Sequence, residues 1–378
     1  MMMEKKKVGI ITFHASHNYG SMLQAYALQQ TVLGMGCECE IINFRTERQR
    51  EFYRPIFSRG SFVDRLKRSL FYAPYLLAWK KKQQLFERFL KEKYRLSSKE
   101  YSTLEELEAA TLDYDVYISG SDQIWNISAL DFDWAYFLPF AGSSRRVAYA
   151  PSMGPLPHQL TFNREKADKT AGLLKNYDYI SVREQQTMEI VTHLTDADYY
   201  TVTLDPTLLV ESQKWSIMAG EAPLIKGNYI FLYTPWYNAD VYEEANRMSK
   251  TLKIPIVVSL FHDGALANLK IMRRHYHCLL ASGPLEFLNL CKFATYTIGE
   301  SFHLVAFSIL FRKPFFAVNG MEDSRVMDLL KLTGLEHRSV SPIKGFSTIP
   351  TQIDFDEVHH RLADAKKQSL NWLRESLC

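Results

Sequence analysis

Short apolar runs alternate with amphipathic stretches along most of the chain. The run VGIITFH at 8–14 indicates a buried strand, and the stretch SMLQAYALQQTVLGMG, which follows the polar loop ASHNYG, places Leu28 and Val32 on one helical face. The run CECEIINF at 37–44 indicates the next strand. A strand, a helix and a strand in this order predict a βαβ unit, and therefore a parallel sheet.

The same pattern recurs in two series. Strands that end in polar residues are indicated by DVYISGSDQIWN, RRVAYAPSMG, YDYISVRE and YYTVTLDP, and later by NYIFLYTPW, IPIVVSL, ATYTIGE and KPFFAVNG. The second series also predicts helices at 239–252, at 302–312 and after Ser282, which is the expected cap. Open α/β sheets bind ligands at the carboxyl ends of their strands. We predict an α/β fold of two doubly wound Rossmann-like domains that face a cleft.

The length of the chain supports two domains. One hydrophobic core rarely organises a chain as long as 378 residues. We place an N-terminal Rossmann-like domain at 1–205, with a basic helical insertion at 45–100, and a C-terminal Rossmann-like domain at 206–350. The remaining stretch, 351–378, predicts a helix that can cross back to the first domain.

Composition narrows the class of protein. Hydrophobic residues make up 47% and charged residues 23% of the chain, which is typical of a globular protein, and no apolar run approaches the roughly 20 residues of a membrane-spanning helix. The first apolar run, VGIITF, is too short for the core of a signal peptide. The cysteines are odd in number and lack metal-ligand spacing: Cys37, Cys39, Cys278, Cys291 and Cys378. We expect a cytoplasmic protein with reduced thiols and no metal site.

The charge is unevenly distributed. Between Arg45 and Arg95, 15 basic residues stand against 5 acidic ones, so this segment carries +10 while the rest of the chain carries −7 within a total of +3. A solvated helical face is the simplest interpretation. The second is peripheral docking at an anionic membrane or a lipid diphosphate, because Phe71 and Trp79 adjoin the lysines at 80–82. Nucleic-acid binding has no supporting module and is not expected.

Several motifs occur in a fixed order over most of the chain. They are HNYGSMLQAYALQ, ISGSDQIWN, YAPSMG, SVRE, LDPTLLV, GPLEFL and ESFHLVAFSILFRKPFFAV. Together they resemble the polysaccharide pyruvyl transferase family. The resemblance implies a fold similar to that of two-domain (GT-B-like) glycosyltransferases. It also implies transfer of pyruvyl from phosphoenolpyruvate, as donor co-substrate without a further cofactor, to two hydroxyls of a sugar, often in a lipid-linked precursor.

The resemblance also implies roles for particular residues. Arg183 in SVRE is expected to meet the donor, His303 in SFH to be catalytic, and Arg325 to bind the donor as a further cation. Glu300 and Ser301 belong to the same motif and are candidate substrate ligands. Ser301 stands where another branch of the family has arginine, and Leu304 where glycine is common. These differences leave a carbohydrate- or anion-binding protein of reduced activity as an alternative, beside a glycosyltransferase that uses a nucleotide sugar in the same cleft.

The chemistry of phosphoenolpyruvate suits these residue types. Its phosphate and carboxylate require cations or backbone N–H groups, and addition of an alcohol to its double bond requires an acid and a base. His303 follows a strand and begins a helix, so it is either an acid/base group or a core histidine. Arg183 at a helix start opposes the helix dipole, which favours a bound anion or a carboxylate such as Glu184 over a surface salt bridge. Arg325 can equally be a solvated helix residue, and Asp205 a turn residue.

Two loops supply the remaining candidates. The N–H groups at Asn18, Gly20 and Ser21 can hold phosphate or sugar, although a plain helix cap explains these residue types equally well. Ser121 and Asp122 can cap the following segment, and Asp122 is alternatively a base for a hydroxyl or a sugar ligand.

Overall fold

The computed structural model describes residues 5–54, 61–155, 163–198, 200–260, 262, 265–274, 276–341 and 352–378. Within them, the first sheet has seven parallel strands. In spatial order these are β3 (Leu96–Tyr101), β2 (Glu38–Phe44), β1 (Lys7–Ile11), β4 (Val116–Ser119), β5 (Arg145–Ala148), β6 (Tyr179–Val182) and β7 (Thr201–Val202).

A second parallel sheet has six strands within the described residues. In spatial order they are β10 (His277–Cys278), β9 (Ile256–Val258), β8 (Ile230–Tyr233), β11 (Tyr296–Gly299), β12 (Phe315–Val318) and β13 (Ser339–Val340). The central strands β8, β11 and β12 are buried at every residue, as expected for parallel strands that helices cover on both faces. The predicted α/β fold with two parallel-sheet domains is confirmed.

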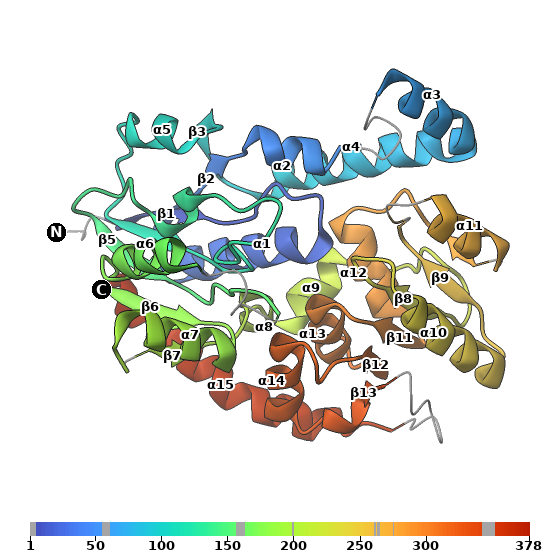
Figure 1. Ribbon diagram of the computed structural model, residues 1–378. Helices are drawn as coiled ribbons and strands as arrows, with labels where there is room; N and C mark the ends of the chain where they lie inside the picture. The colour runs from blue at the N-terminus through green and yellow to red at the C-terminus, as the bar shows by residue number, and fades with distance from the viewer. Residues whose placement is uncertain are drawn as a thin grey trace.

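Helices surround both sheets (Figure 1). The first half contains α1 (Tyr19–Gly34), α2 (Glu47–Phe52), α3 (Phe62–Phe71), η2 (Ala73–Tyr75), α4 (Leu76–Lys93), α5 (Leu104–Glu108), η3 (Trp134–Phe137), α6 (Arg164–Leu174) and α7 (Gln185–Thr195). The linking segment and second half contain α8 (Pro206–Leu209), α9 (Ser212–Met218), α10 (Ala239–Leu252), α11 (Ala265–Arg273), α12 (Pro284–Phe293), α13 (Phe302–Leu310), α14 (Ser324–Thr333), η5 (Glu336–Arg338) and α15 (Phe355–Leu377). No helix in the described ranges is both long and apolar enough to cross a membrane.

Two local predictions are corrected by the structure. The stretch 45–100 is not helical throughout, because its last residues form β3, which pairs in parallel with β2 at the edge of the sheet. Ser282 is not the cap of α12. Its hydroxyl donates to the carbonyl of Leu279, and Gly283 caps the helix, with its N–H bonded to Glu286 Oε2 at 2.9 Å.

The final helix contacts both halves of the molecule, and Figure 1 shows α15 extending from α14 toward the first sheet. Near the start of the helix, Asp356 Oδ1 lies 2.8 Å from Nη1 of Arg312 in the second half. Ser369 accepts a hydrogen bond of 3.0 Å from the Leu204 N–H, and the carbonyl of Ser376 accepts one of 3.4 Å from Arg145 of β5. The predicted boundary at 350 and 351 lies outside the described residues.

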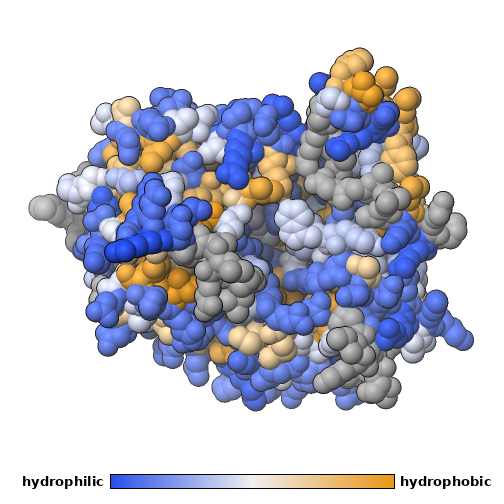
Figure 2. Space-filling view, viewed as in Figure 1, coloured by the Kyte–Doolittle hydropathy of each residue, from blue (hydrophilic) through white to orange (hydrophobic). Residues whose placement is uncertain are grey.

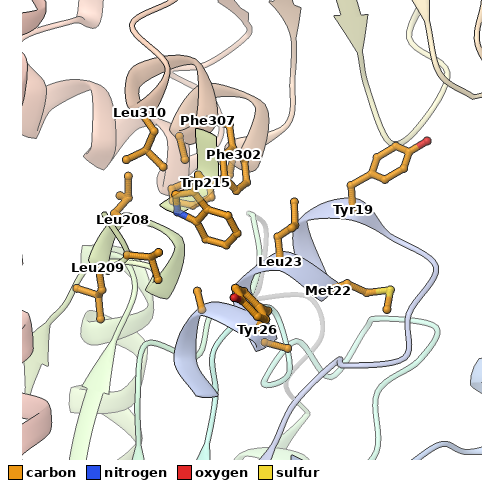
Figure 3. Packing of buried hydrophobic residues seen from close by; sticks show 14 of the residues in the cluster. Tyr19, Met22, Leu23, Tyr26, Leu208, Leu209, Trp215, Phe302, Phe307 and Leu310 are labelled. Carbon is orange, nitrogen blue, oxygen red and sulfur yellow. The ribbon is translucent and has the colours of Figure 1, made fainter. Parts of the chain in front are cut away.

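An apolar core continues from one half into the other. Figure 3 shows Trp215 of α9 between Tyr26 of α1 and the α13 residues Phe307 and Leu310. The ring of Trp215 lies 5.2 Å from that of Phe307 and 5.8 Å from that of Tyr26, centroid to centroid. Because close-packed interiors resist relative displacement, this core fixes the two sheets with the carboxyl ends of their strands facing one cavity.

Candidate active site

A cavity of about 840 Å³ lies between the two sheets. Much of its lining comes from segments that follow β1, β4, β8, β11 and β12, and includes Asn18, Asp122, Trp236, His303 and Arg325. All of these segments leave the carboxyl ends of parallel strands, which is where open α/β sheets bind ligands. The cavity is therefore the candidate active site.

Arg183 is buried directly after β6, with 2% of its side chain exposed. Its Nη1 lies 3.0 Å from Asp205 Oδ2 and 3.5 Å from Asp122 Oδ1, and its Nε lies 3.7 Å from Glu184 Oε2. The guanidinium also lies over the ring of Phe302, 5.0 Å from the centroid. The surface salt bridge considered above is excluded, because the arginine is buried among carboxylates, of which Asp205 is the closest.

His303 is the second residue of α13 and lines the cavity with 7% of the residue exposed. Its Nε2 lies 3.5 Å from Asp205 Oδ2, which is longer than a good hydrogen bond. Within the described part of the chain, neither His303 Nε2 nor Arg183 Nη2 has a hydrogen-bond partner. The structure therefore brings Arg183 of the first half and His303 of the second half to the same carboxylate oxygen.

Asp205 connects these two groups. Its Oδ1 caps α8 by accepting bonds from the Thr207 N–H and hydroxyl, at 2.9 and 2.7 Å, and this fixes Oδ2 toward Arg183 and His303. Burial alone would raise the pKa of Asp205, but the charges of a protonated His303 and of Arg183, together with the bond from Thr207, hold it well below its ordinary value. The sequence indicated a turn at Asp205 but not that its Oδ2 would approach Arg183 and His303.

Arg325 lies at the first turn of α14 and also lines the cavity. Its Nε donates to Asp323 Oδ1 at 2.9 Å, and its Nη2 pairs with Asp323 Oδ2. Burial would lower the pKa of Arg325, but Asp323 reverses this effect and raises it. Only 12% of the side chain is exposed, so Arg325 is not a solvated helix residue.

Glu300 and Ser301 have structural bonds at the cavity wall. Glu300 accepts bonds from Asn238, from Thr234 at 3.2 Å and from Asn319 at 3.4 Å, and therefore links the segments that follow β8, β11 and β12. Burial raises the pKa of Glu300. The hydroxyl of Ser301 accepts the Leu304 N–H at 3.4 Å and caps α13. Ser301 thus determines where the helix that carries the histidine begins.

The loop before α1 forms a helix cap. Asn18 Oδ1 accepts hydrogen bonds from the N–H groups of Gly20 and Ser21 at 2.9 and 3.4 Å. The cap therefore already uses two of the N–H groups that were candidates for binding phosphate or sugar. Asn18 and Ser21 line the cavity, whereas Gly20 is absent from its lining. Gly20 instead packs against the imidazole of His303, where a β-carbon would lie 2.0 Å from Nδ1. Its role is to make room for the histidine.

Ser121 and Asp122 have different environments in the structure. Ser121 is completely buried, its hydroxyl donates to the carbonyl of Ala150 at 2.6 Å, and it is absent from the lining of the cavity. Asp122 faces the cavity and stands 3.5 Å from Arg183. It has a positive φ of 80°, which aspartate tolerates better than most residues.

Asp131 lines the cavity and was not predicted. Its Oδ2 accepts bonds from the Tyr53 hydroxyl at 3.1 Å and from Ser16 at 3.4 Å. Burial, with a smaller contribution from the charge of Asp122, raises the pKa of Asp131 to about 6. A carboxyl group that titrates near neutrality can exchange protons with a substrate. The available sequence signal was the presence of two acidic residues, Asp131 and Asp133, among the apolar residues of the stretch ALDFDW.

Lys82 of α4 was also missed, because it belongs to a run of lysines. It lines the cavity, where its Nζ lies 5.0 Å from the centroid of the Tyr19 ring and donates to the carbonyl of Ser259 at 3.4 Å. Burial lowers its pKa to about 7. Among the residues described, Lys82 has no ion pair with a carboxylate, and no group of His, Cys, Asp and Glu side chains could hold a metal ion.

The chain matches a known protein family over most of its length. The model of the family described as polysaccharide pyruvyl transferase matches residues 18–320. The chain belongs to the polysaccharide pyruvyl transferase family. The resemblance drawn from the motifs is thus confirmed, and the chain is a transferase of polysaccharide modification. Comparison with curated protein sequences gives no match.

Solved structures with a similar fold are only distantly related in sequence. UDP-N-acetylglucosamine 2-epimerase from Rickettsia bellii has a TM-score of 0.52 at 8% identity, with 99% of this chain and 97% of that chain covered. The Neisseria meningitidis UDP-GlcNAc 2-epimerase bound to UDP-GlcNAc has a TM-score of 0.51 at 11% identity over 97% and 93%. An alpha-glucosyltransferase in complex with UDP and DNA has a TM-score of 0.50 at 9% identity over 99% and 95%. These similarities establish that this pyruvyl transferase family member has a GT-B-like fold.

Proposed function

We propose that this family member transfers pyruvyl from phosphoenolpyruvate to two hydroxyls of a sugar in a cell-surface polysaccharide precursor, forming a cyclic ketal. The observation that carries the proposal is the convergence of Arg183 and His303 on Asp205, beside the cavity between the sheets that His303 lines. Each of them keeps a nitrogen without a hydrogen-bond partner among the described residues. Phosphoenolpyruvate requires such a combination of a fixed cation and a proton-transfer group.

Three cations are proposed to bind the donor. Arg183 offers the unpartnered Nη2, and Arg325 offers the part of its guanidinium that Asp323 does not hold. Lys82 lacks a carboxylate partner in the described structure, and binding an anion offsets the cost of burying its charge. No cofactor beyond the donor enters the proposed reaction.

The proposed reaction has two stages. In the first, a sugar hydroxyl oxygen bonds to C2 of the donor while His303 protonates the methylene carbon, which becomes a methyl group. Asp131, whose pKa burial raises to about 6, takes the hydroxyl proton. In the second, the C2–O bond to phosphate breaks, the second sugar hydroxyl adds at C2, and its proton leaves with the phosphate. The products are one ketal and one inorganic phosphate.

The acceptor is proposed to rest on an aromatic platform. Trp236 follows β8, lines the cavity and is 62% exposed, which is unusual for so large an apolar side chain. The ring of Phe52 lies 6.1 Å from it, centroid to centroid, on the opposite half of the molecule. Aromatic faces suit the apolar face of a sugar ring, while their polar neighbours bind its hydroxyls.

The test combines phosphate release with the mass of the acceptor. Purified protein is incubated with phosphoenolpyruvate and either nitrophenyl sugars or lipid-linked sugars. We expect phosphate release together with an acceptor mass increased by one pyruvate less one water. His303→Ala should abolish both signals, and the control His193→Ala, at an exposed position of α7, should leave them unchanged. Transfer that requires a nucleotide sugar instead would favour the glycosyltransferase, and pyruvyl transfer that survives His303→Ala would contradict the mechanism.

A further inference from the structure

Helix α3 presents an apolar surface that the rest of the described chain does not cover. None of its ten residues is buried, and Phe62, Leu66 and Leu70 are 79%, 53% and 71% exposed. In Figure 1 the helix projects at the top right beside α4, and Figure 2 shows hydrophobic residues gathered there. Isolated exposed apolar residues are ordinary, but a contiguous patch marks an interaction surface.

The apolar side chains share one face of α3. Phe62, Leu66 and Leu70 follow one another at intervals of four, and Val63, which is 56% exposed, lies beside them. Leu77 at the start of α4 adds a side chain that is 82% exposed. A helix with one apolar face and basic residues on the remaining surface is typical of helices that lie in a membrane interface.

The helix is held in place although it contributes little to the core. Ser61 and Asp64 form a capping box at its first turn. Tyr72 at its end is buried, with its hydroxyl accepting a bond of 2.8 Å from Asn268 and its ring 5.0 Å from that of Trp79. The apolar face therefore belongs to an ordered element anchored on the second half of the molecule.

The charge of the same segment indicates which kind of partner the surface binds. From Ser61 to Lys81 there are five cations (Arg65, Lys67, Arg68, Lys80 and Lys81) and one acid, Asp64, which gives +4. A second copy of this chain would bring the same positive segment to a symmetric interface, which electrostatic repulsion disfavours. An anionic lipid surface complements both the apolar face and the cations, and each cation near such a surface contributes about 1 kcal/mol.

We propose that α3, with the beginning of α4, docks the protein on the surface of an anionic membrane. The apolar side chains of α3 enter the boundary between headgroups and acyl chains, and the lysines and arginines contact the headgroups. Trp79 and Lys82 of the adjoining α4 line the cavity, so docking through α3 brings one wall of the cavity toward the lipid. The docking is independent of the reaction proposed above, and the following experiment requires no catalysis.

Sedimentation with vesicles tests the proposal on the full chain. We expect binding to vesicles that contain phosphatidylglycerol, weak binding to pure phosphatidylcholine, and loss of binding as salt increases. The variant Phe62→Ser/Leu66→Ser/Leu70→Ser should weaken binding at least about tenfold. Ile217→Ser on α9 is the matched control, because Ile217 is 71% exposed and distant in sequence, and it should bind as the wild type does.

A charge variant and a spectroscopic probe complete the test. Arg65→Glu/Lys67→Glu/Arg68→Glu should abolish binding to phosphatidylglycerol, with an unchanged unfolding temperature showing that the fold is intact. The fluorescence of Leu66→Trp should shift to the blue on binding, and brominated acyl chains should quench it. The proposal would be overturned if the serine variant and the Ile217 control bound vesicles equally, or if binding did not depend on anionic lipid. It would also be overturned if the wild type bound no vesicles but formed a dimer that the serine variant lost.

Discussion

Gly20 and His303 are in direct contact across the two halves of the molecule, and a β-carbon on Gly20 would lie 2.0 Å from His303 Nδ1. No flexible side chain can yield at this contact, because the imidazole is itself buried against the start of α1. Gly20 is therefore required by the position of the histidine and not by a ligand.

Gly20→Ala is expected to displace His303. Overpacking at a buried contact costs about 1–3 kcal/mol of stability, and a displacement of about 1 Å at a reacting group lowers the rate about 100-fold. Thermal unfolding and the pyruvyl transfer assay measure the two effects. Gly34→Ala is the control in the same helix, since a β-carbon there meets nothing within 4 Å. Equal behaviour of the two variants would refute the steric argument.

Asp205→Asn is expected to lose both stability and activity. The amide retains the cap on α8 but removes the negative charge between Arg183 and His303, which leaves a buried cation without its closest partner, at a cost of about 3 kcal/mol. Because the folded-state pKa of Asp205 is depressed, its contribution is present above its unfolded pKa of about 4 and is lost as the pH falls below that value. Denaturant unfolding should show this loss in the wild type and not in the variant.

Asp131 is expected to make stability depend on pH in the opposite direction to Asp205. Burial raises its pKa from 3.8 to about 6, so the folded state favours the protonated carboxyl group. The stability of the wild type relative to Asp131→Asn should therefore fall by roughly 3 kcal/mol as the pH rises from about 4 to about 6. Urea unfolding at several pH values measures this difference. A constant difference across that range would place the carboxyl group in a more polar environment.

Lys82→Gln is expected to weaken donor binding. Since burial lowers the pKa of Lys82 to about 7, its charged form predominates below that pH, and the KM of the wild type for phosphoenolpyruvate should rise above it. The glutamine variant should have a KM raised about tenfold at pH 6 and without this pH dependence. Lys81→Gln is the neighbouring control, because Lys81 is exposed and does not line the cavity.

Trp236→Ala is expected to weaken binding of the sugar acceptor and not of the donor. Loss of the exposed indole at the cavity should raise the KM for the sugar about tenfold and leave the KM for phosphoenolpyruvate unchanged. Trp236→Phe retains an aromatic face and should recover most of the affinity. An alanine variant with a normal KM for the sugar would exclude this platform.

Much of the fold was predictable because its signals are local. The helix predicted at 239–252 coincides with α10, and the strands around VGIITF and CECEIINF form β1 and β2. Strand β3 was not predicted, because LSSKEY is polar and gains its pairing only from β2 at the edge of the sheet. Tertiary context decided that element, as it often does for strands.

The site was predictable only where a motif marks the end of a strand. Arg183 and His303 follow β6 and β11 and both approach Asp205, but of the two only His303 belongs to the cavity lining. The environment of Asp131 comes from Tyr53, which is distant in sequence, so no local pattern indicates the raised pKa. Ser121 illustrates a related limit: a polar residue after a strand can bond inward, here to the carbonyl of Ala150 just beyond β5.

The position of Asp205, at the point where the chain leaves β7 for α8, has a consequence for assembly. In the mechanism proposed above, neither half of the protein holds the reacting groups by itself: one supplies the guanidinium, the other the imidazole, and the carboxylate that both approach sits on the connection between them. Under that mechanism, activity requires the two halves to be docked correctly. A chain whose second half has folded but not docked would then be inactive, so an activity measurement would also report on the completed tertiary structure.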